Sequence, residues 1–276
     1  MVISNFASPP PETQGVLVTF PIPRVLLATI NLEKRMNALP ARACFELDAL
    51  WKWFDEESEL CVGIITGAGK KAFSAGMDLK EQGADYSKFT YASHYPATGF
   101  AGLTRRTGKK PIIAAVNGHA HGGGFEIALN SDLVIASPNA NFRLPDVLRG
   151  TAALEGAFPR ICRTFGLQRA MLLTLTAYTL HAKEAREWGL VLKIVPAEKL
   201  VDEAVKLAGW IAAMSPDSVV ISRAGVREAW KTASVDEVTN LTLEKYADVL
   251  MKGDNAKEGM LAFAEKRKPK WVPSKL

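Results

Sequence analysis

The sequence contains little cysteine and no long apolar run. Only three cysteines occur among its 276 residues, Cys44, Cys61 and Cys162, and they are widely separated. This odd number excludes a disulfide framework and predicts reduced thiols in the core of an intracellular protein. No apolar run reaches the roughly 18 residues that cross a bilayer, so no membrane span is expected. The first residues lack the basic and apolar segments of a secretory signal, and residues 1–14 are interpreted as a flexible arm.

Histidine is also scarce, and no nucleic-acid motif is present. His119 and His121 are two residues apart, but no Cys/His pair has ligand spacing, so no metal site is expected. The formal net charge is +5, and the basic residues are scattered except for a cluster at 266–270. A phosphate-rich small ligand accounts for this excess without nucleic acid as a partner.

The first half of the chain alternates short strand-like runs with helical patterns. A helix is predicted over 41–56, because its apolar residues fall on one stripe. Alternating strands and helices indicate an α/β fold. The runs rich in Val and Ile that predict strands are 16–20, 25–30, 62–66, 112–116 and 133–136.

After about residue 160 the sequence is mostly helical. Apolar residues three and four apart predict helices over 198–214, 217–231 and 235–251. We therefore divide the chain into the arm at 1–14, an α/β core at 15–200, a helical region at 201–271 and a short tail at 272–276.

Two glycine-containing turns follow predicted strands. The first is Phe73–Leu79, and the second is Asn117–Glu126, which contains three consecutive glycines before a helical segment. Glycines at a strand-to-helix junction allow close backbone approach and leave N–H groups available at a helix N-terminus. Such groups can bind a developing oxyanion. The turns match neither a P-loop nor the dinucleotide-binding pattern.

Four carboxylates follow the second turn, namely Glu126, Asp132, Asp146 and Glu155. Two carboxyl groups that face one substrate can divide acid and base work between them. Sequence spacing alone does not decide which of the four face one another.

Five segments together resemble the enoyl-CoA hydratase/isomerase (crotonase) superfamily. The resemblance covers the chain from about residue 16 to 271, and the segments occur in the order of the family. The segments are Asn31–Leu39, Phe73–Leu79, Val116–Leu129, Asp132–Ala136 with Ala140–Phe142, and Glu258–Pro269.

The resemblance implies a fold and a ligand. The fold is a ClpP-like spiral of ββα units, followed by a C-terminal helical region that builds trimers or dimers of trimers. The ligand is an acyl-CoA thioester, with no prosthetic group, whose carbonyl oxygen accepts hydrogen bonds from the backbone N–H groups of Met77 and Gly123. The positions implied for CoA binding are Lys34, Arg35, Ala38, Ala75, Asp78, Leu79 and Lys80.

The acids favour hydration or dehydration. Family hydratases use two glutamates; Glu126 matches the first position, and Asp146 occupies the second as a shorter acid. Simple isomerases generally keep only the second acid. Dienoyl-CoA isomerases carry an acid one position before Glu155, which makes Glu155 a third candidate and isomerisation the alternative. Other thioester chemistry, or a non-catalytic CoA- or RNA-binding role, is less favoured because both acids are present.

The chain ends in Ser274-Lys275-Leu276, the tripeptide that the peroxisomal import receptor reads. The prolines before it predict an irregular, exposed tail. A peroxisomal location is expected, with the import receptor as a partner. It fits fatty-acid β-oxidation or the assembly of a branched acyl group for a secondary metabolite or siderophore. The acyl length does not follow from the sequence.

Overall fold

The computed structural model describes residues 6–78, 95–231, 244–245 and 253–275, and its main element is a six-stranded sheet. Strand β1 runs antiparallel to β2, and the other neighbours are parallel. All five predicted strands belong to this sheet. Its strands, in spatial order, are β1 (Val16–Thr19), β2 (Val25–Ile30), β3 (Val62–Gly67), β5 (Ile112–Val116), β7 (Leu133–Ala136) and β10 (Lys193–Ile194).

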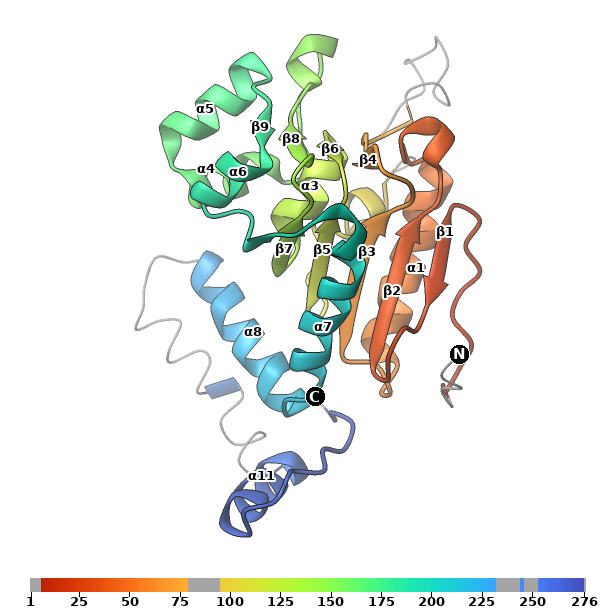
Figure 1. Ribbon diagram of the computed structural model, residues 1–276, viewed down its shortest axis with the longest axis vertical. Helices are drawn as coiled ribbons and strands as arrows, with labels where there is room; N and C mark the ends of the chain where they lie inside the picture. Colours follow the sequence, from red (N-terminus) through yellow and green to blue (C-terminus); the bar gives the residue numbers. More distant parts are fainter. Residues whose placement is uncertain (1–5, 79–94, 232–243, 246–252, 276) are drawn as a thin grey trace.

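A second, four-stranded sheet lies beyond one end of the first (Figure 1). The chain visits the two sheets alternately, since β4 follows β3, β6 follows β5 and β8 follows β7. Helix α3 (Gly123–Asn130) then follows β6, and α4 (Ala157–Phe165) comes after β8. This confirms the expected spiral of ββα units. The strands of the smaller sheet are β4 (Ala72–Ser74), β6 (His119–His121), β8 (Asn141–Arg143) and β9 (Leu180–His181).

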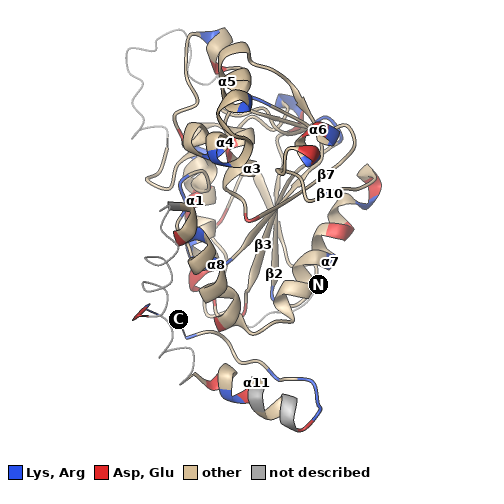
Figure 2. Ribbon diagram, turned by 90° about the vertical axis from the view of Figure 1, so that its left-hand side faces the viewer, with Lys and Arg blue, Asp and Glu red and all other residues tan. Residues whose placement is uncertain are grey.

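Helices on both faces of the larger sheet bury its central strands, whereas the edge strands β1 and β10 keep exposed residues. Helix α1 (Ala41–Glu56) covers one face and α7 (Leu200–Ala212) covers the other (Figure 2). Alternate residues of β5 therefore enter different cores: Ile112 and Ala114 pack in the cluster that contains α1, whereas Ile113 packs in the cluster that contains α7. Burial on two faces explains why these strands are continuous apolar runs.

The remaining helices surround this core. The predicted helix over 198–214 corresponds to η5 and α7, and the helix over 217–231 corresponds to α8; the one predicted over 235–251 lies outside the described residues except for 244–245. In Figures 1 and 2, α11 lies at the end of the molecule opposite α5. These elements are α5 (Leu167–Thr176), α6 (Ala182–Glu187), α8 (Pro216–Lys231), α11 (Asp254–Ala264), and the 3₁₀ helices η1 (Glu33–Arg35), η3 (Phe100–Gly102), η4 (Asp146–Arg149) and η5 (Ala197–Lys199).

Within the described parts of the chain, no single helix is long and apolar enough to cross a membrane. One bent pair, Ala197–Ala212 with Pro216–Trp230, meets the length and composition criteria when its two helices are taken together, at an angle of 105°.

The N-terminal arm is packed rather than flexible over its described residues, 6–14. The ring of Phe6 packs edge-on against Trp53 of α1, with centroids 5.3 Å apart. The indole Nε1 of Trp53 donates to the carbonyl of Ser8 at 3.1 Å, and the Ala7 N–H donates to Glu57 at 2.9 Å. The expected loose arm is corrected accordingly: its single aromatic residue anchors it to α1.

The C-terminal residues are irregular, as predicted, but are held on the surface rather than free. Asn255, only 2% exposed, accepts from the Val272 N–H at 2.9 Å and donates to the Val272 carbonyl at 3.0 Å. The indole of Trp271 donates to the carbonyl of Ala213 at 2.8 Å. The Lys275 amine, on a side chain that is 82% exposed, pairs with Asp254 at 2.7 Å. The tail is thus fixed to α11 and to the end of α7.

Candidate active site

The loop after β4 directs the Met77 N–H away from the neighbouring chain. Met77 forms a parallel bridge with Leu39. The bonds of this bridge come from the flanking residues: Leu39 donates to the Gly76 carbonyl at 2.8 Å, and Asp78 donates to the Leu39 carbonyl at 2.9 Å. Because successive residues of an extended chain point their N–H groups to opposite sides, the N–H of Met77 faces the side away from Leu39.

Glycine at position 76 brings this loop onto the start of α3. A Cβ atom on Gly76 would lie 3.2 Å from the Gly123 nitrogen and 2.9 Å from the His121 carbonyl oxygen. Gly76 also has a φ of +89°, which favours glycine. Gly123 is the first residue of α3, so its N–H has no acceptor within the helix. The structure therefore brings together the two segments predicted to supply oxyanion donors.

Two glycines of the triplet, Gly123 and Gly124, allow the start of α3 to pack closely against its neighbours. A Cβ atom on Gly123 would lie 2.5 Å from the Phe100 ring, and one on Gly124 would clash with the Ser74 carbonyl oxygen. Phe100 is 1% exposed, so it has no room to move away.

The Tyr95 hydroxyl donates to the Met77 Sδ at 2.8 Å. The predictions did not single out Tyr95, because a lone aromatic after the second motif carries no distinguishing pattern.

Glu126 lies on α3 one turn after Gly123 and is only 4% exposed. The pKa of Glu126 is raised to about 8, mainly by burial, and the charges of Asp146 and Glu155 act in the same direction. The Ala157 N–H, which donates to Glu126 Oε1 at 3.0 Å, acts in the opposite direction. Glu126 is therefore mainly protonated at neutral pH and can donate a proton.

Asp146 and Glu155 both lie close enough to Glu126 to raise its pKa. Asp146 begins η4 after β8, and Glu155, 7% exposed, precedes α4. Burial raises the pKa of both carboxyl groups. The Oδ2 of Asp146 and the Oε2 of Glu155 are buried and have no hydrogen-bond partner among the described residues. Three of the four candidate acids thus form one cluster.

The fourth candidate, Asp132, lies elsewhere and serves the fold. Its carboxylate pairs with Arg223 at 2.9 Å and with Arg227 at 2.8 Å, and it accepts from the Ile112 N–H at 2.8 Å. Although burial acts to raise the pKa of Asp132, the two guanidinium groups hold it below its ordinary value. Asp132 anchors α8 to the larger sheet.

The positions implied for CoA binding lie around η1 and the loop after β4. Lys34 and Arg35 are exposed in η1, and Arg35 pairs with the buried carboxylate of Asp78 at 2.6 Å. Ala38 is 9% exposed, and Ala75 is half-buried. Leu79 and Lys80 lie outside the described residues.

The histidines and cysteines at described positions do not form a metal site. His119 and His121 both hydrogen-bond to Asn141 Oδ1, at 3.0 and 2.8 Å. In the described part of the chain, no group of three His, Cys, Asp or Glu side chains could hold a metal ion. The expectation of core thiols is wrong for Cys162, which is exposed on α4. Cys44 is buried as expected, and Cys61 is half-buried.

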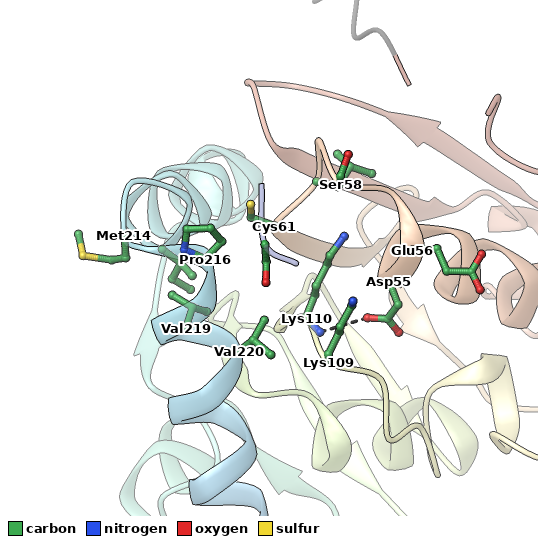
Figure 3. Close-up of a pocket in the computed structure, with 13 residues that line it drawn as sticks. Asp55, Glu56, Ser58, Cys61, Lys109, Lys110, Met214, Pro216, Val219 and Val220 are labelled. Atoms are coloured by element: carbon green, nitrogen blue, oxygen red, sulfur yellow. Dashed lines mark hydrogen bonds between the residues drawn. The ribbon is translucent and has the colours of Figure 1, made fainter. Parts of the chain in front are cut away.

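A separate small pocket, of about 30 Å³, lies between the end of α1 and the start of α8 (Figure 3). Its walls include Cys61, Lys110 and Ser274 but none of the three clustered acids. The Lys110 amine donates to the Phe54 carbonyl at 2.7 Å, and burial lowers the pKa of Lys110 to about 8. This lysine holds the end of α1 in place.

Comparison with known proteins identifies the family of this site. The family model described as enoyl-CoA hydratase/isomerase matches residues 24–274, almost the whole chain. The chain belongs to the enoyl-CoA hydratase/isomerase family.

Members of this family that resemble the chain over nearly its whole length include hydratases and dehydratases. The mevalonyl-coenzyme A hydratase of Aspergillus fumigatus is 45% identical over 96% of this chain and 98% of its own. The carnitinyl-CoA dehydratase of Escherichia coli K12 is 38% identical over 88% of this chain and 93% of its own. The crystal structure of enoyl-CoA hydratase from Bacillus anthracis superposes with a TM-score of 0.85 at 29% identity, covering 95% of this chain and 100% of its own. The protein is therefore an enzyme, a hydro-lyase that acts on a coenzyme A thioester.

Proposed function

We propose that this enzyme interconverts a 3-hydroxyacyl-CoA and its 2-enoyl-CoA, and that the acyl group is short, branched and polar, of the mevalonyl type. The observation that carries the proposal is the cluster of Glu126 and Asp146 beside the two turns that contain Met77 and Gly123. The similarity to a mevalonyl-CoA hydratase, at 45% identity, supports the acyl type.

The proposed roles follow from the positions of the groups. The thioester oxygen accepts from the N–H groups of Met77 and Gly123, and such donors stabilise the transition state by about 3 kcal/mol each at related sites. In the dehydration direction Asp146 takes the proton next to the carbonyl, which leaves an enolate. Glu126 then gives its proton to the departing hydroxyl, which leaves as water. Hydration reverses both transfers.

The shorter second acid suits a branched substrate. Aspartate reaches about 1.5 Å less than glutamate, one carbon–carbon bond. The proposal is that this shorter reach leaves space beside C3 for a methyl group.

The direct test measures the absorbance of the conjugated thioester with purified enzyme. We expect 3-methyl-substituted, hydroxylated enoyl-CoA thioesters to be hydrated with a higher kcat/KM than straight-chain enoyl-CoAs of the same length. Equal or higher kcat/KM for the straight-chain thioesters would contradict the acyl type while leaving the hydro-lyase activity intact.

Isomerisation is the second candidate, and Glu155 is the observation that favours it. Glu155 lies within electrostatic reach of Glu126, so it could serve as an additional acid. An isomerase would create the conjugated absorbance from an unconjugated enoyl-CoA without net uptake of water. Product identification in H₂¹⁸O separates the two, because only hydration incorporates the label.

The pKa of Glu126 predicts the high-pH side of the dehydration rate profile. Because its pKa is raised to about 8, the required protonated form is present below this pH and is lost above it. We expect kcat/KM for dehydration in the free enzyme to fall about tenfold per pH unit above about pH 8. A stopped-assay pH series tests this, and a flat profile up to pH 10 would remove Glu126 as the proton donor.

We also propose a peroxisomal location, with the import receptor as partner, in acyl breakdown or in the assembly of a branched acyl group for a secondary metabolite or siderophore. The support is the C-terminal Ser274-Lys275-Leu276. Residues 265–276 fused to the C-terminus of a fluorescent reporter are expected to carry it into peroxisomes, and removal of Leu276 to leave it in the cytosol. A cytosolic signal from the intact fusion would refute the targeting.

A homotrimer or a dimer of trimers is proposed as the assembly. A groove of about 1100 Å³ between α8 and the core has exposed apolar side chains in its walls, among them Leu192, Val226 and Trp230. Such a groove supports association, since large exposed apolar patches mark interaction sites. Light scattering after size-exclusion chromatography gives the mass, and a 30.0 kDa monomer would refute the assembly.

A further inference from the structure

Two buried oxygens beside the acid cluster have no hydrogen-bond partner among the described residues. They are Oε2 of Glu155 and Oγ1 of Thr104. Glu155 is 7% exposed, and Thr104 is 0% exposed. Buried polar groups are nearly always paired in folded proteins, so two such atoms in one place indicate a site that a polar ligand group can complete.

Gly99 lets its backbone lie directly against both of these oxygens. A Cβ atom built on Gly99 would clash with Thr104 Oγ1 and would lie 2.8 Å from Glu155 Oε2. The two oxygens therefore face the same small region. Gly99 also has a φ of +80°, a conformation that side chains disfavour, so the backbone itself reserves this position for glycine.

Phe100 connects this region to the reacting end of the substrate. Its ring lies against Gly123, the proposed oxyanion donor, and its backbone N–H interacts with the Glu155 carboxyl group. Glu155 also lies within electrostatic reach of Glu126. The two unpaired oxygens are thus linked, through Phe100 and Glu155, to the proposed oxyanion donor and to the acid cluster.

We propose that Glu155 and Thr104 bind a hydroxyl group on the acyl chain beyond C3, which makes the enzyme selective for acyl-CoA substrates hydroxylated near the end of the chain. A hydroxyl donates one hydrogen bond and accepts others, so it donates to Glu155 Oε2 and accepts from the Thr104 hydroxyl. This inference rests on the proposed function, because it specifies the acyl class that the same site takes.

Other acyl ends fit this region less well. An alkyl end would bury both oxygens without partners, which costs binding free energy. A trimethylammonium end has no N–H to donate and no lone pair for the Thr104 hydroxyl. Recognition of a substrate hydroxyl by buried groups discriminates strongly, because the analogue that lacks the hydroxyl leaves those groups unpaired.

The test uses two thioesters that differ by one oxygen, 5-hydroxy-3-methylpent-2-enoyl-CoA and 3-methylpent-2-enoyl-CoA. The quantity compared is the ratio of their kcat/KM values for hydration. This ratio cancels any change in the acidity of Glu126, because both substrates undergo the same reaction. The enzymes are the wild type, Thr104→Val, Glu155→Met and, as a control on the exposed end of α6, Glu187→Gln.

The wild type is expected to prefer the hydroxylated thioester by at least about 100-fold. Both Thr104→Val and Glu155→Met should lower the ratio by about 10- to 100-fold, the range of a single hydrogen bond to such groups, while Glu187→Gln keeps it. Thr104→Val nearly preserves shape, so it tests the inference even if Glu155→Met fails to fold.

Three results would overturn the inference. The first is a wild type that treats the two thioesters alike, and the second is a pair of variants that lose activity on both equally. The third is a wild-type preference for the trimethylammonium analogue over the 5-hydroxy thioester. A wild type that hydrates neither thioester but hydrates straight-chain enoyl-CoAs would instead contradict the acyl type in the proposed function.

Discussion

Replacing Glu126 with Gln is expected to lower kcat by at least about a hundredfold, the low end of a general acid–base contribution. The amide keeps the shape of the protonated carboxyl group that the site holds at neutral pH, so the Ala157 N–H retains its acceptor. What is lost is the proton that the mechanism delivers to the leaving hydroxyl. Steady-state kinetics on the 3-hydroxyacyl-CoA measures the loss, with Glu187→Gln as the control.

The same variant has a second signature in its stability. The folded pKa of Glu126, about 8, lies above its ordinary value of 4.5, so the folded protein holds a proton that the unfolded chain releases between these values. The stability of the wild type therefore falls as pH rises from about 4.5 to about 8. Glutamine removes this contribution, so the melting temperature of the variant should decline less over that range. A folded Glu126→Gln variant with nearly full activity would contradict the assignment of Glu126 as the proton donor.

Asp146→Asn is expected to reduce hydration by about a hundredfold, within the range for loss of a general acid. The asparagine amide would keep the size of the side chain but could not deliver a proton to the carbon next to the thioester carbonyl. Asp146→Glu keeps an ionisable group and should retain far more activity than Asp146→Asn. The measurement is kcat/KM for hydration and, in parallel, for double-bond migration.

These two rates also separate the candidate reactions. In a hydratase, Asp146→Asn is expected to lose nearly as much hydration activity as Glu126→Gln. In an isomerase that uses Glu155 instead, migration would largely survive the change at 146. Survival of hydration itself in folded Asp146→Asn would show that another group delivers the proton to this carbon.

Five of the six strands of the larger sheet, and its covering helices, were predictable from their apolar patterns, whereas β10 has only two residues and was not predicted. The predicted helix over 41–56 has the bounds of α1, since Leu47, Leu50 and Phe54 fall on a single apolar stripe. By contrast, β4, β6 and β8 have three residues each, too few to show a period of two. Strands β4 and β6 overlap the two glycine-containing turns and β8 follows Ala140, and only the pairing of the sheet reveals all three.

The candidate residues of the site could be named from the sequence, but their arrangement in space could not. Spacing could not distinguish Asp132 from Asp146, because the difference depends on Arg223 and Arg227, about 90 residues later in the chain. The approach of Gly76 to Gly123 likewise depends on the packing of two sheets. The unpaired oxygens of Thr104 and Glu155 leave no trace in sequence, since an unmet hydrogen bond is a property of the fold.

The two hydrogen bonds between the Asn255 side chain and the backbone of Val272, here called the Asn255 clamp, stabilise the folded chain end. They also compete with any protein that binds this part of the chain end. Both backbone polar groups of Val272 are already used by Asn255, and the neighbouring Trp271 indole is bound to Ala213. A protein that binds the last few residues competes with Asp254 for Lys275, whereas one that binds a longer stretch of the chain end must also break these hydrogen bonds, at about 1 kcal/mol each. An affinity tag fused after Leu276 leaves the clamp intact, whereas truncation before Val272 removes it and exposes the side chain of Asn255.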